Sequence, residues 1–285
     1  MVTPRTDISI VDKRLPKRQR SDRIALLIHD LRGGGAERVV LKLAKGMIAA
    51  GRQVDLVLVR AQGAYADQIP AGVRVIDLDK SNVFKAVPAL VRYLRQEKPR
   101  ALLSNLTHVN VAALIAKMIA GGQTRIAVTE HNQLSVKAST RTSWRSWAVY
   151  RLAPYLYHLA DEVVGVSQGV ADDVARFARL GPNRVKCIYN PVYDESLAEA
   201  SHQPVEHPWL RPGQLPVVMA AGRLHRQKGF DVLLHAFATA RLSTPSRLII
   251  MGEGEERGRL EALVETLSLG QHVSLMGFVP IQIAQ

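Results

Sequence analysis

Short apolar runs alternate along this sequence with longer stretches in which apolar residues recur every three or four positions. Most of the runs are apolar on consecutive residues and rich in Val, Ile and Leu, which is typical of strands buried on both faces of a parallel sheet. We predict strands over Arg23–His29, Val54–Val59, Val73–Leu78, Ala101–Leu106, Arg125–Thr129, Glu162–Ser167 and Arg184–Tyr189. A helix is predicted over Ala36–Ala50, where the apolar residues share one stripe. Repeated βα units predict a doubly wound α/β domain over residues 22–190.

The pattern stops at residue 191 and resumes near residue 213. The interval 191–212 is rich in proline and has no apolar period, so we predict an interdomain linker. Over 213–285 the alternation returns, with predicted strands and helices over Leu215–Ala221, Phe230–Arg241, Leu248–Met251, Arg257–Leu267 and Val273–Met276. This second Rossmann-like unit is shorter than most domains, and no helix follows its last strand. We therefore expect an incomplete, C-terminally truncated second domain.

Composition and charge narrow the class of protein. Hydrophobic residues make up 47% and charged residues 22% of the chain, as in folded globular proteins. Apolar runs are too short for a membrane span, and the N-terminal segment lacks the apolar core of a secretory signal. Residues 1–21 are rich in basic side chains and have no apolar period, so we predict a disordered basic tail there. The only cysteine, Cys187, excludes an intrachain disulfide, so a reducing, cytoplasmic setting is expected.

The charge of the chain favours anionic partners. Lys and Arg number 38 against 25 Asp and Glu, which gives a net charge of +13. Such an excess suits nucleic acid, phosphorylated metabolites or acidic lipid headgroups. The sequence has no RNP, zinc-knuckle or helix-turn-helix motif, so nucleic acid is not an expected partner.

Three consecutive glycines, Gly33, Gly34 and Gly35, lie between the first predicted strand and its helix. Glycines here let backbone N–H groups at a helix N-terminus approach an anion. A dinucleotide fingerprint that begins at Gly33 needs a third glycine at position 38, where the sequence has Arg38. This weakens the interpretation as a nicotinamide oxidoreductase. When this motif is considered by itself, the alternative is a tight turn that binds no ligand.

A second glycine-bounded loop, Gly222–Gly229 (GRLHRQKG), again follows a predicted strand and precedes a helix. Arg223 offers a planar fork of donors and Lys228 a point charge, and both suit a diphosphate. A solvated basic loop is the alternative. Because open parallel sheets bind ligands at the carboxyl ends of their strands, the position of the loop favours a ligand site.

Seven motifs together resemble one family. They are Ile28–Arg38 (IHDLRGGGAER), Thr129–Asn132 (TEHN), Val166–Gly169 (VSQG), Ile188–Val192 (IYNPV), Gly222–Asp231 (GRLHRQKGFD), Met251–Glu256 (MGEGEE) and Met276–Pro280 (MGFVP). In this order and spacing they resemble the GT4 family of retaining, nucleotide-sugar-dependent glycosyltransferases with the GT-B architecture. The resemblance covers residues 22–280. It implies two Rossmann-like domains that face each other across a cleft, the first for the acceptor and the second for the donor.

The resemblance also implies roles for individual residues. The glycine loop would lie against the donor diphosphate and sugar, and His131 would contact the donor sugar near the reacting centre, with loop capping as its alternative role. Arg223 and Lys228 would bind the diphosphate and stabilise charge on the leaving nucleotide. The residues implied are His131, Arg223 and Lys228 as catalytic groups, and Gly33, Gly34, Gly35, Arg223, Lys228, Gly277, Phe278 and Val279 as contacts to the donor, the last three at the nucleobase.

Two departures concern acidic residues. The family's paired glutamates, in a segment beginning near EGFP, would follow the last residue of this sequence. Glu253 and Glu261 share their spacing but belong to an earlier turn and helix, so that role is not transferred to them. Asp77 and Asp79 match an Asp-x-Asp metal motif of the other large transferase architecture, but such pairs are common at strand ends. We expect no metal and no other cofactor.

Aromatic and basic residues alternate over Thr142–Ala160. The aromatic residues are Trp144, Trp147, Tyr150, Tyr155 and Tyr157, and the basic ones are Arg141, Arg145, Arg151 and His158. Aromatic residues among arginines suit a membrane interface or a lipid-linked acceptor. The alternative is a helix whose apolar face packs on the sheet. Pro154 is expected to kink or divide this helix.

Taken together with these features, the resemblance implies a glycosyltransferase that moves a sugar from a UDP-linked donor to a lipid-linked or polysaccharide acceptor with retention. We expect the acceptor hydroxyl to attack on the face that the nucleotide leaves, with a diphosphate oxygen taking the proton, so that no enzyme nucleophile is needed. Peripheral contact with an anionic membrane at its cytoplasmic face is expected. The alternative is a catalytically inactive fragment of such an enzyme that lacks the donor-site glutamates.

Overall fold

The computed structural model describes residues 21–32, 34–139, 143–193, 199, 202 and 207–278. The chain divides into two compact units, with the boundary between Val192 and Tyr193. We refer to them as unit 1 and unit 2 and describe each by itself. The boundary falls at the start of the predicted linker 191–212. Residues 1–20 of the predicted basic tail and most of that linker lie outside the described residues.

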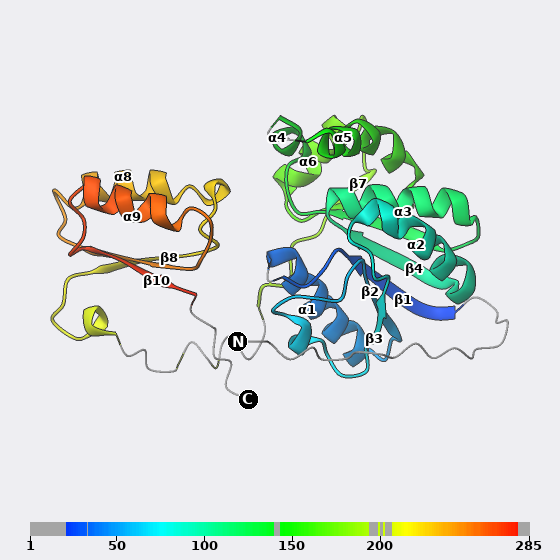
Figure 1. Cartoon of the computed structure of the whole chain (residues 1–285), viewed down its shortest axis with the longest axis horizontal. Helices are drawn as coiled ribbons and strands as arrows, with labels where there is room; N and C mark the ends of the chain where they lie inside the picture. Colours follow the sequence, from blue (N-terminus) through cyan, green and yellow to red (C-terminus); the bar gives the residue numbers. More distant parts are fainter. Residues whose placement is uncertain are drawn as a thin grey trace. The chain divides into compact units, whose positions relative to one another are not determined.

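Unit 1 is built on one parallel sheet of seven strands (Figure 1). The strands are β1 (Ser21–Ile28), β2 (Val54–Leu58), β3 (Arg74–Asp77), β4 (Pro99–Asn105), β5 (Arg125–Glu130), β6 (Glu162–Gly165) and β7 (Val185–Cys187). All seven strands predicted for this unit are confirmed. Their order is β3-β2-β1-β4-β5-β6-β7, so the direction of winding reverses between β1 and β4. Open α/β sheets bind ligands at such a switch point, beyond the carboxyl ends of the strands.

Helices cover both faces of this sheet. They are α1 (Gly35–Ala49), α2 (Val83–Glu97), α3 (Thr107–Ala120), α4 (Leu134–Ser139), α5 (Trp144–Leu156) and α6 (Gln168–Phe177), with short 3-10 turns at Ala66–Gln68 and Tyr157–Leu159. Leu26 and Ile28 of β1 belong to the apolar cluster that includes α1, whereas Ala25 and Leu27 belong to the cluster that includes α2 and α3. Because alternate residues face opposite sides, a strand buried on both faces is apolar at most of its consecutive positions.

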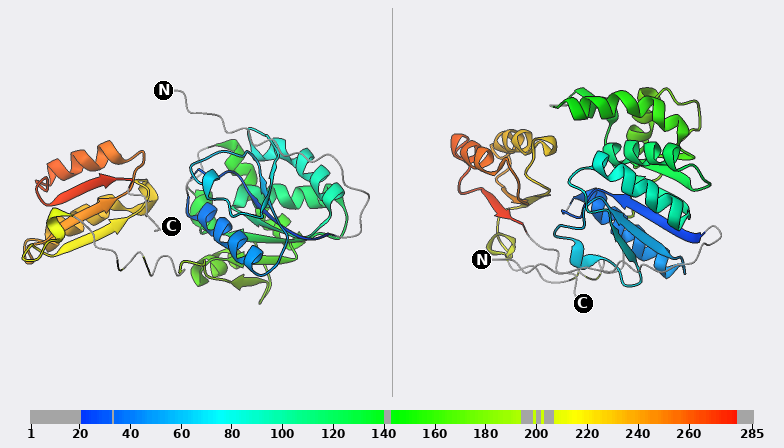
Figure 2. Two further views of the ribbon diagram at one scale, coloured as in Figure 1. Left: turned by 90° about the horizontal axis from the view of Figure 1, so that it is seen from below. Right: turned by 45° about the vertical axis from the view of Figure 1, so that its right-hand side comes forward.

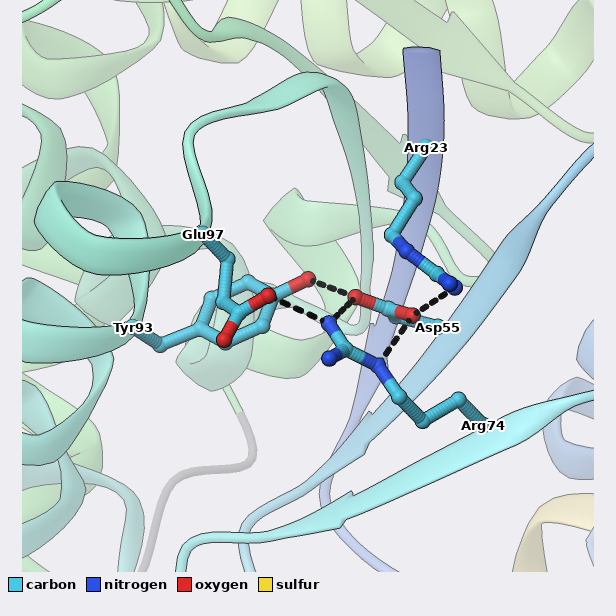
Figure 3. A network of polar contacts seen from close by, with 5 residues as sticks. All are labelled: Arg23, Asp55, Arg74, Tyr93 and Glu97. Carbon is cyan, nitrogen blue, oxygen red and sulfur yellow. Dashed lines mark hydrogen bonds and ion pairs between the residues drawn. The ribbon is translucent and has the colours of Figure 1, made fainter. Parts of the chain in front are cut away.

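A buried carboxylate holds the amino edge of the sheet together (Figure 3). Asp55 of β2 is fully buried, and its oxygens accept hydrogen bonds from Arg23 of β1 (3.0 Å), Arg74 of β3 (2.9 and 2.6 Å) and the Tyr93 hydroxyl of α2 (2.8 Å). Arg74 also donates to Glu97 at the end of α2 (2.7 Å). Burial and the neighbouring Asp55 raise the pKa of Tyr93, which keeps its hydroxyl a donor. This network ties three strands and one helix together at the edge opposite the expected ligand site.

Unit 2 is a smaller parallel α/β unit. Its strands β8 (Val217–Ala221), β9 (Arg247–Met251) and β10 (Val273–Gly277) form a sheet in the order β10-β9-β8. Helices α8 (Phe230–Ala240) and α9 (Arg257–Thr266) lie on one face of it, as Figures 1 and 2 show. The core between helices and sheet contains Phe230, Leu234, Phe237, Leu248, Ile250, Leu260 and Val264. The five strands and helices predicted for this unit are confirmed. Short 3-10 turns occupy Pro208–Leu210 and Arg226–Lys228.

Candidate functional site

Three loops meet at the carboxyl edge of the sheet in unit 2. Residues 222–229 follow β8, residues 252–256 follow β9, and Phe278 follows β10. The backbone N–H of Gly222 donates to the carbonyl of Met251 (2.9 Å), and that of Gly252 donates to the carbonyl of Gly277 (2.7 Å). These bonds hold the ends of the three strands in register beyond the sheet. The loops therefore form a defined surface.

Glycine is required where the first two loops touch. Gly252 has φ of +145°, and a Cβ there would lie 1.9 Å from the carbonyl oxygen of Gly222. A Cβ on Gly254 would lie 2.2 Å from the carbonyl oxygen of Leu224. Any side chain at these positions would force the two backbones apart. The glycines of the MGEGEE motif thus position the basic loop that precedes α8.

Arg223 and Lys228 are exposed cations on that basic loop. Neither side chain makes a hydrogen bond or ion pair with any described residue. His225, between them, is engaged locally: its Nδ1 accepts from the backbone N–H of Gln227 (3.1 Å) and its Nε2 lies 3.4 Å from Glu255. Gly229 takes φ of +65° where α8 begins. Two cations beside exposed backbone at a strand end suit a phosphate group.

Two acidic residues of this edge are paired with one arginine. Arg257 of α9 donates to Glu253 (2.5 Å) and to Glu261 (2.8 Å). Glu253, in the loop after β9, and Glu261 of α9 thus share one cation at this edge. Gly277 has φ of +79° and Phe278 is exposed beside it. Val279 lies outside the described residues.

In unit 1 the glycine loop after β1 contains a carboxylate of its own. Gly34 is the N-cap of α1, and Gly33 lies outside the described residues. A Cβ on Gly34 would meet the Glu37 carboxylate at 2.3 Å, so Glu37 folds back over the helix N-terminus. Burial raises the pKa of Glu37, whereas contacts with the backbone N–H groups of Glu37 and Gly34 lower it. Arg38, the residue that departs from the dinucleotide fingerprint, donates to the Tyr65 hydroxyl (3.2 Å).

His131 lies directly after β5 and is partly buried. Its Nε2 is 3.2 Å from Oδ1 of Asn105, at the end of the neighbouring strand β4. Burial lowers the pKa of His131 to about 4, so the ring is neutral at pH 7. An amide oxygen only accepts, so Nε2 carries the hydrogen and Nδ1 is the acceptor. The ring therefore has a hydrogen-bond acceptor, Nδ1, at the carboxyl edge of the sheet.

A buried polar network lies next to His131. Glu130 is fully buried and accepts hydrogen bonds from Thr107 (2.8 Å), from Nδ2 of Asn110 (2.8 Å) and from the Tyr157 hydroxyl. Burial raises the pKa of Glu130 to about 7, and its hydrogen-bond donors oppose that rise. The network joins β5, α3 and the turn after α5. It therefore holds the backbone on which His131 is mounted.

The sequence interpretation missed several of these groups. Asn105 and Glu130 were not singled out, and neither were His29 and His108, whose ring centres lie 5.4 Å apart. Each of them depends on a partner from another strand, helix or turn. A signal was present for His29, which stands in the IHDLRGGGAER motif, and for Glu130, which precedes His131 in TEHN. Nothing in the sequence alone distinguishes Asn105 or His108 from other polar residues.

The expected aromatic helix has two different faces. Val149, Ala153 and Leu156 of α5 are buried against the rest of unit 1. Trp144 (74% exposed) and Tyr155 (71% exposed) face outward. Trp147 and Leu152 are also exposed, and Arg151 lies 5.9 Å from the centre of the Trp147 ring. We refer to Trp144, Trp147, Arg151, Leu152 and Tyr155 as the α5 surface.

The grouping of all five aromatic residues was wrong in one respect. Tyr157 is fully buried with its hydroxyl on Glu130, and Tyr150 is partly buried. The α-helix contains Pro154 and ends two residues later, where a 3-10 turn follows. His158 in that turn contacts the carbonyl of Ala178. Arg141 and the side chain of Arg145 lie outside the described residues.

Neither a metal site nor a membrane span is found in the described part of the chain. No group of three His, Cys, Asp or Glu side chains there could hold a metal ion. Asp77 accepts a hydrogen bond from the backbone N–H of Asp79 (2.8 Å), which makes the Asp-x-Asp sequence a local turn. None of the described helices combines the length and apolarity needed to cross a bilayer.

Two parallel α/β units, with loops at the carboxyl edge of each sheet, give the chain the GT-B fold. Its fold is similar to HepE of Anabaena, whose crystal structure is a complex with UDP (TM-score 0.67, 22% identity, 91% of this chain and 70% of that chain). It is also similar to sucrose-phosphate synthase of Thermosynechococcus elongatus (TM-score 0.70, 19% identity, 92% and 71%).

The family follows from the sequence as a whole. A model described as Glycosyltransferase Family 4 matches residues 33–196, more than half of the chain, and one described as Glycosyl transferases group 1 matches residues 205–284. The chain therefore belongs to glycosyltransferase family 4. A curated relative is the N-acetylgalactosamine-N,N'-diacetylbacillosaminyl-diphospho-undecaprenol 4-alpha-N-acetylgalactosaminyltransferase of Campylobacter jejuni, 27% identical over 266 residues, which are 90% of this chain and 69% of the relative.

Proposed function

We propose that this glycosyltransferase moves a sugar from a UDP-linked donor to a sugar hydroxyl of a lipid-linked acceptor, with retention of anomeric configuration. The observation that carries the proposal is the position of Arg223 and Lys228, two cations without a partner among the described residues, after the carboxyl end of β8. The acceptor class is supported by the relative from Campylobacter jejuni, whose name specifies a sugar attached to diphospho-undecaprenol. The nucleotide is supported by the UDP in the Anabaena structure.

Each site residue has a distinct part in this proposal. Arg223 and Lys228 bind the diphosphate and neutralise the charge that develops on the leaving UDP, which is the role that a metal ion has in other transferases. Backbone groups of Gly277, Phe278 and Val279 contact the uracil. His131, neutral at pH 7, accepts a hydrogen bond at Nδ1 from a hydroxyl of the donor sugar. The glycine loop of Gly33, Gly34 and Gly35 lies against the donor diphosphate and sugar.

Retention requires no enzyme nucleophile. The acceptor oxygen attacks the anomeric carbon on the face from which UDP departs, so the new C–O bond forms where the old one breaks. The electron pair of the broken bond stays on the diphosphate oxygen, and that oxygen takes the proton of the acceptor hydroxyl. UDP and the elongated acceptor are the products. The enzyme contributes position and positive charge.

The α5 surface supports peripheral contact with an anionic membrane at its cytoplasmic face. Tryptophan and tyrosine favour the membrane interface, where their rings are apolar and their polar atoms remain hydrated. Two exposed tryptophans, a tyrosine and an arginine on one helix meet this description. A lipid-linked acceptor stays in the membrane, so attachment would bring the enzyme to its substrate.

Turnover of a panel of UDP-sugars with undecaprenyl-diphosphate-linked sugars tests the function. We expect UDP release that depends on the acceptor, and a product whose anomeric proton has the coupling constant of the donor's anomer. An inverted product would contradict retention. UDP binding without turnover of any combination would favour the alternative of a catalytically inactive chain, and no UDP binding would contradict the proposal itself.

A further inference from the structure

A pocket of about 240 Å³ lies at the carboxyl edge of unit 1 and has no role in the function proposed above. His29 follows β1, and His108 lies in the first turn of α3, which follows β4. The pocket therefore has a histidine from each side of the point where the winding of the sheet reverses. Its lining consists of His29, Asn82, Val83, Phe84, His108, Ser146, Val149 and Tyr150.

The two histidines form a neutral polar pair. Their ring centres are 5.4 Å apart, with the planes inclined by 53°. Nδ1 of His29 is buried and makes no hydrogen bond with any described residue. Burial lowers the pKa of both rings, that of His108 to about 4, so each presents one N–H donor and one nitrogen acceptor at pH 7.

The charge around the pocket disfavours anions. None of the lining residues is a Lys, Arg, Asp or Glu. The carboxylate of Asp30 lies 3.9 Å from Nε2 of His29 and is occupied by Arg32 at 2.5 Å. A phosphate in this pocket would lose its hydration without gaining a cation. A neutral polar ligand would not incur that penalty.

The remaining walls suit a ring with apolar faces and polar edges. Phe84 and Tyr150 are aromatic, and Val83 and Val149 add apolar surface. Asn82 caps α2 through its oxygen, which accepts from the backbone N–H of Lys85 (3.0 Å), and this leaves its NH₂ group as a donor. The volume corresponds to roughly eight water molecules of about 30 Å³ each. That is the scale of one sugar ring.

We propose that the His29–His108 pocket is the subsite for the neutral sugar that carries the reacting hydroxyl of the acceptor. The two imidazoles exchange hydrogen bonds with its hydroxyls, while Phe84 and Tyr150 contact the faces of its ring. The assignment to the acceptor rests on the proposed function, because a donor sugar is attached directly to a diphosphate and these walls have no cation to accompany it. His29 and His108 are thus binding residues that select the acceptor.

Histidine-selective NMR on the full chain tests the subsite. The chain, labelled in its histidine rings and saturated with UDP, is titrated with methyl glycosides of glucose, galactose, N-acetylglucosamine and N-acetylgalactosamine. We expect at least one glycoside to shift the ring signals of His29 and His108 without shifting that of His235, an exposed residue of α8. Glucose 6-phosphate, an anion of similar size, is expected to bind at least tenfold more weakly.

Variants, together with the affinity for UDP, distinguish a failure of the subsite from a failure of the proposed donor site. His108→Asn and Phe84→Ala are each expected to weaken glycoside binding at least fivefold and leave UDP binding unchanged, whereas the matched control His235→Asn changes neither. Equal binding of the phosphate, no shift with any glycoside, or the same shifts with a UDP-hexose would overturn the assignment. Because UDP affinity is measured on the same samples, a wild-type chain that binds UDP but no glycoside refutes the subsite. A wild-type chain that binds a glycoside but no UDP refutes the proposed donor site.

Discussion

Nε2 of His131 lies 3.2 Å from Oδ1 of Asn105, and this contact joins the carboxyl ends of β5 and β4. The amide oxygen fixes which nitrogen of the ring carries the hydrogen, so Nδ1 remains the acceptor. Since the pKa of His131 is lowered to about 4, the acceptor is present throughout the physiological range of pH.

Replacing that amide with a carboxylate tests the relationship. In Asn105→Asp, a negative charge beside the ring favours imidazolium, so the pKa of His131 is expected to rise toward its ordinary range near 6.5. NMR titration of the His131 ring measures this. Transfer is expected to fall at least tenfold below that pKa, because a protonated Nδ1 cannot accept a hydroxyl. A ring that still titrates near pH 4 in the variant would contradict the contact.

Arg223 and Lys228, whose side chains have no partner among the described residues, are expected to bind the diphosphate. Arg223→Ala and Lys228→Ala should each weaken UDP binding by ~1–3 kcal/mol, the range of charge-assisted hydrogen bonds. Titration calorimetry with UDP and GDP measures this, and removal of Mg²⁺ should change the affinity little. Arg211→Ala, an exposed cation elsewhere in unit 2, is the matched control. Unchanged UDP affinity in both loop variants would contradict the assignment of Arg223 and Lys228 to the diphosphate.

Glu37 provides a test of the glycine loop. Its carboxylate lies over the N-terminus of α1, where it would compete with a diphosphate for the same positive end of the helix. If the loop at Gly34 and Gly35 contacts the donor diphosphate, Glu37→Gln should strengthen UDP binding severalfold at pH 7.5. Glu265→Gln, on an exposed position of α9, should have no effect. An unaltered or weaker affinity of the Glu37 variant would count against a diphosphate at this loop.

Glu130 predicts a pH dependence of stability with a definite sign. Its pKa is raised to about 7 in the folded chain from 4.5, so between these values the folded state binds the extra proton. The stability that the raised pKa of Glu130 contributes to the folded state is complete below about pH 4.5, and it is lost as pH rises through 7. Relative to wild type, Glu130→Gln should therefore gain on the order of 3 kcal/mol between pH 4.5 and 8. Urea unfolding at both pH values checks this, and a difference that does not change with pH would contradict it.

The α5 surface predicts membrane binding that depends on lipid charge. Each Lys or Arg near an anionic surface adds about 1 kcal/mol, so sedimentation with liposomes should be greater for acidic than for neutral lipid and should fall with salt. Replacing Trp144 and Tyr155 with Ser should reduce binding severalfold. Leu242→Ser removes an equally exposed apolar side chain from unit 2 and serves as the control. Binding that ignores lipid charge, or a double variant that binds like wild type, would refute this surface.

The strands and the basic loop could be predicted from the sequence because they depend on local patterns. Consecutive apolar residues predict a strand such as β5 whatever its neighbours are. The contacts of Glu130 and the contact of His29 with His108 depend instead on the strand order β1-β4-β5-β6, which no local pattern specifies. Tyr157 shows the same limit. The aromatic and basic residues around Tyr157 suggested a position on the surface. In the structure, the turn after α5 directs its hydroxyl to a buried carboxylate.

The network around Asp55 has a consequence for how this enzyme can diversify. Its five residues brace β1, β2, β3 and α2 at the amino edge, whereas the proposed ligand contacts of unit 1 depend on the opposite edge (Figure 3). Removing one partner of a buried ion pair costs about 3–5 kcal/mol, so changes at the amino edge endanger folding. Changes among the pocket residues alter recognition while this brace stays intact. Substitutions that change the acceptor preference, by natural drift or in a mutant library, can therefore accumulate while the contacts that stabilise unit 1 are kept.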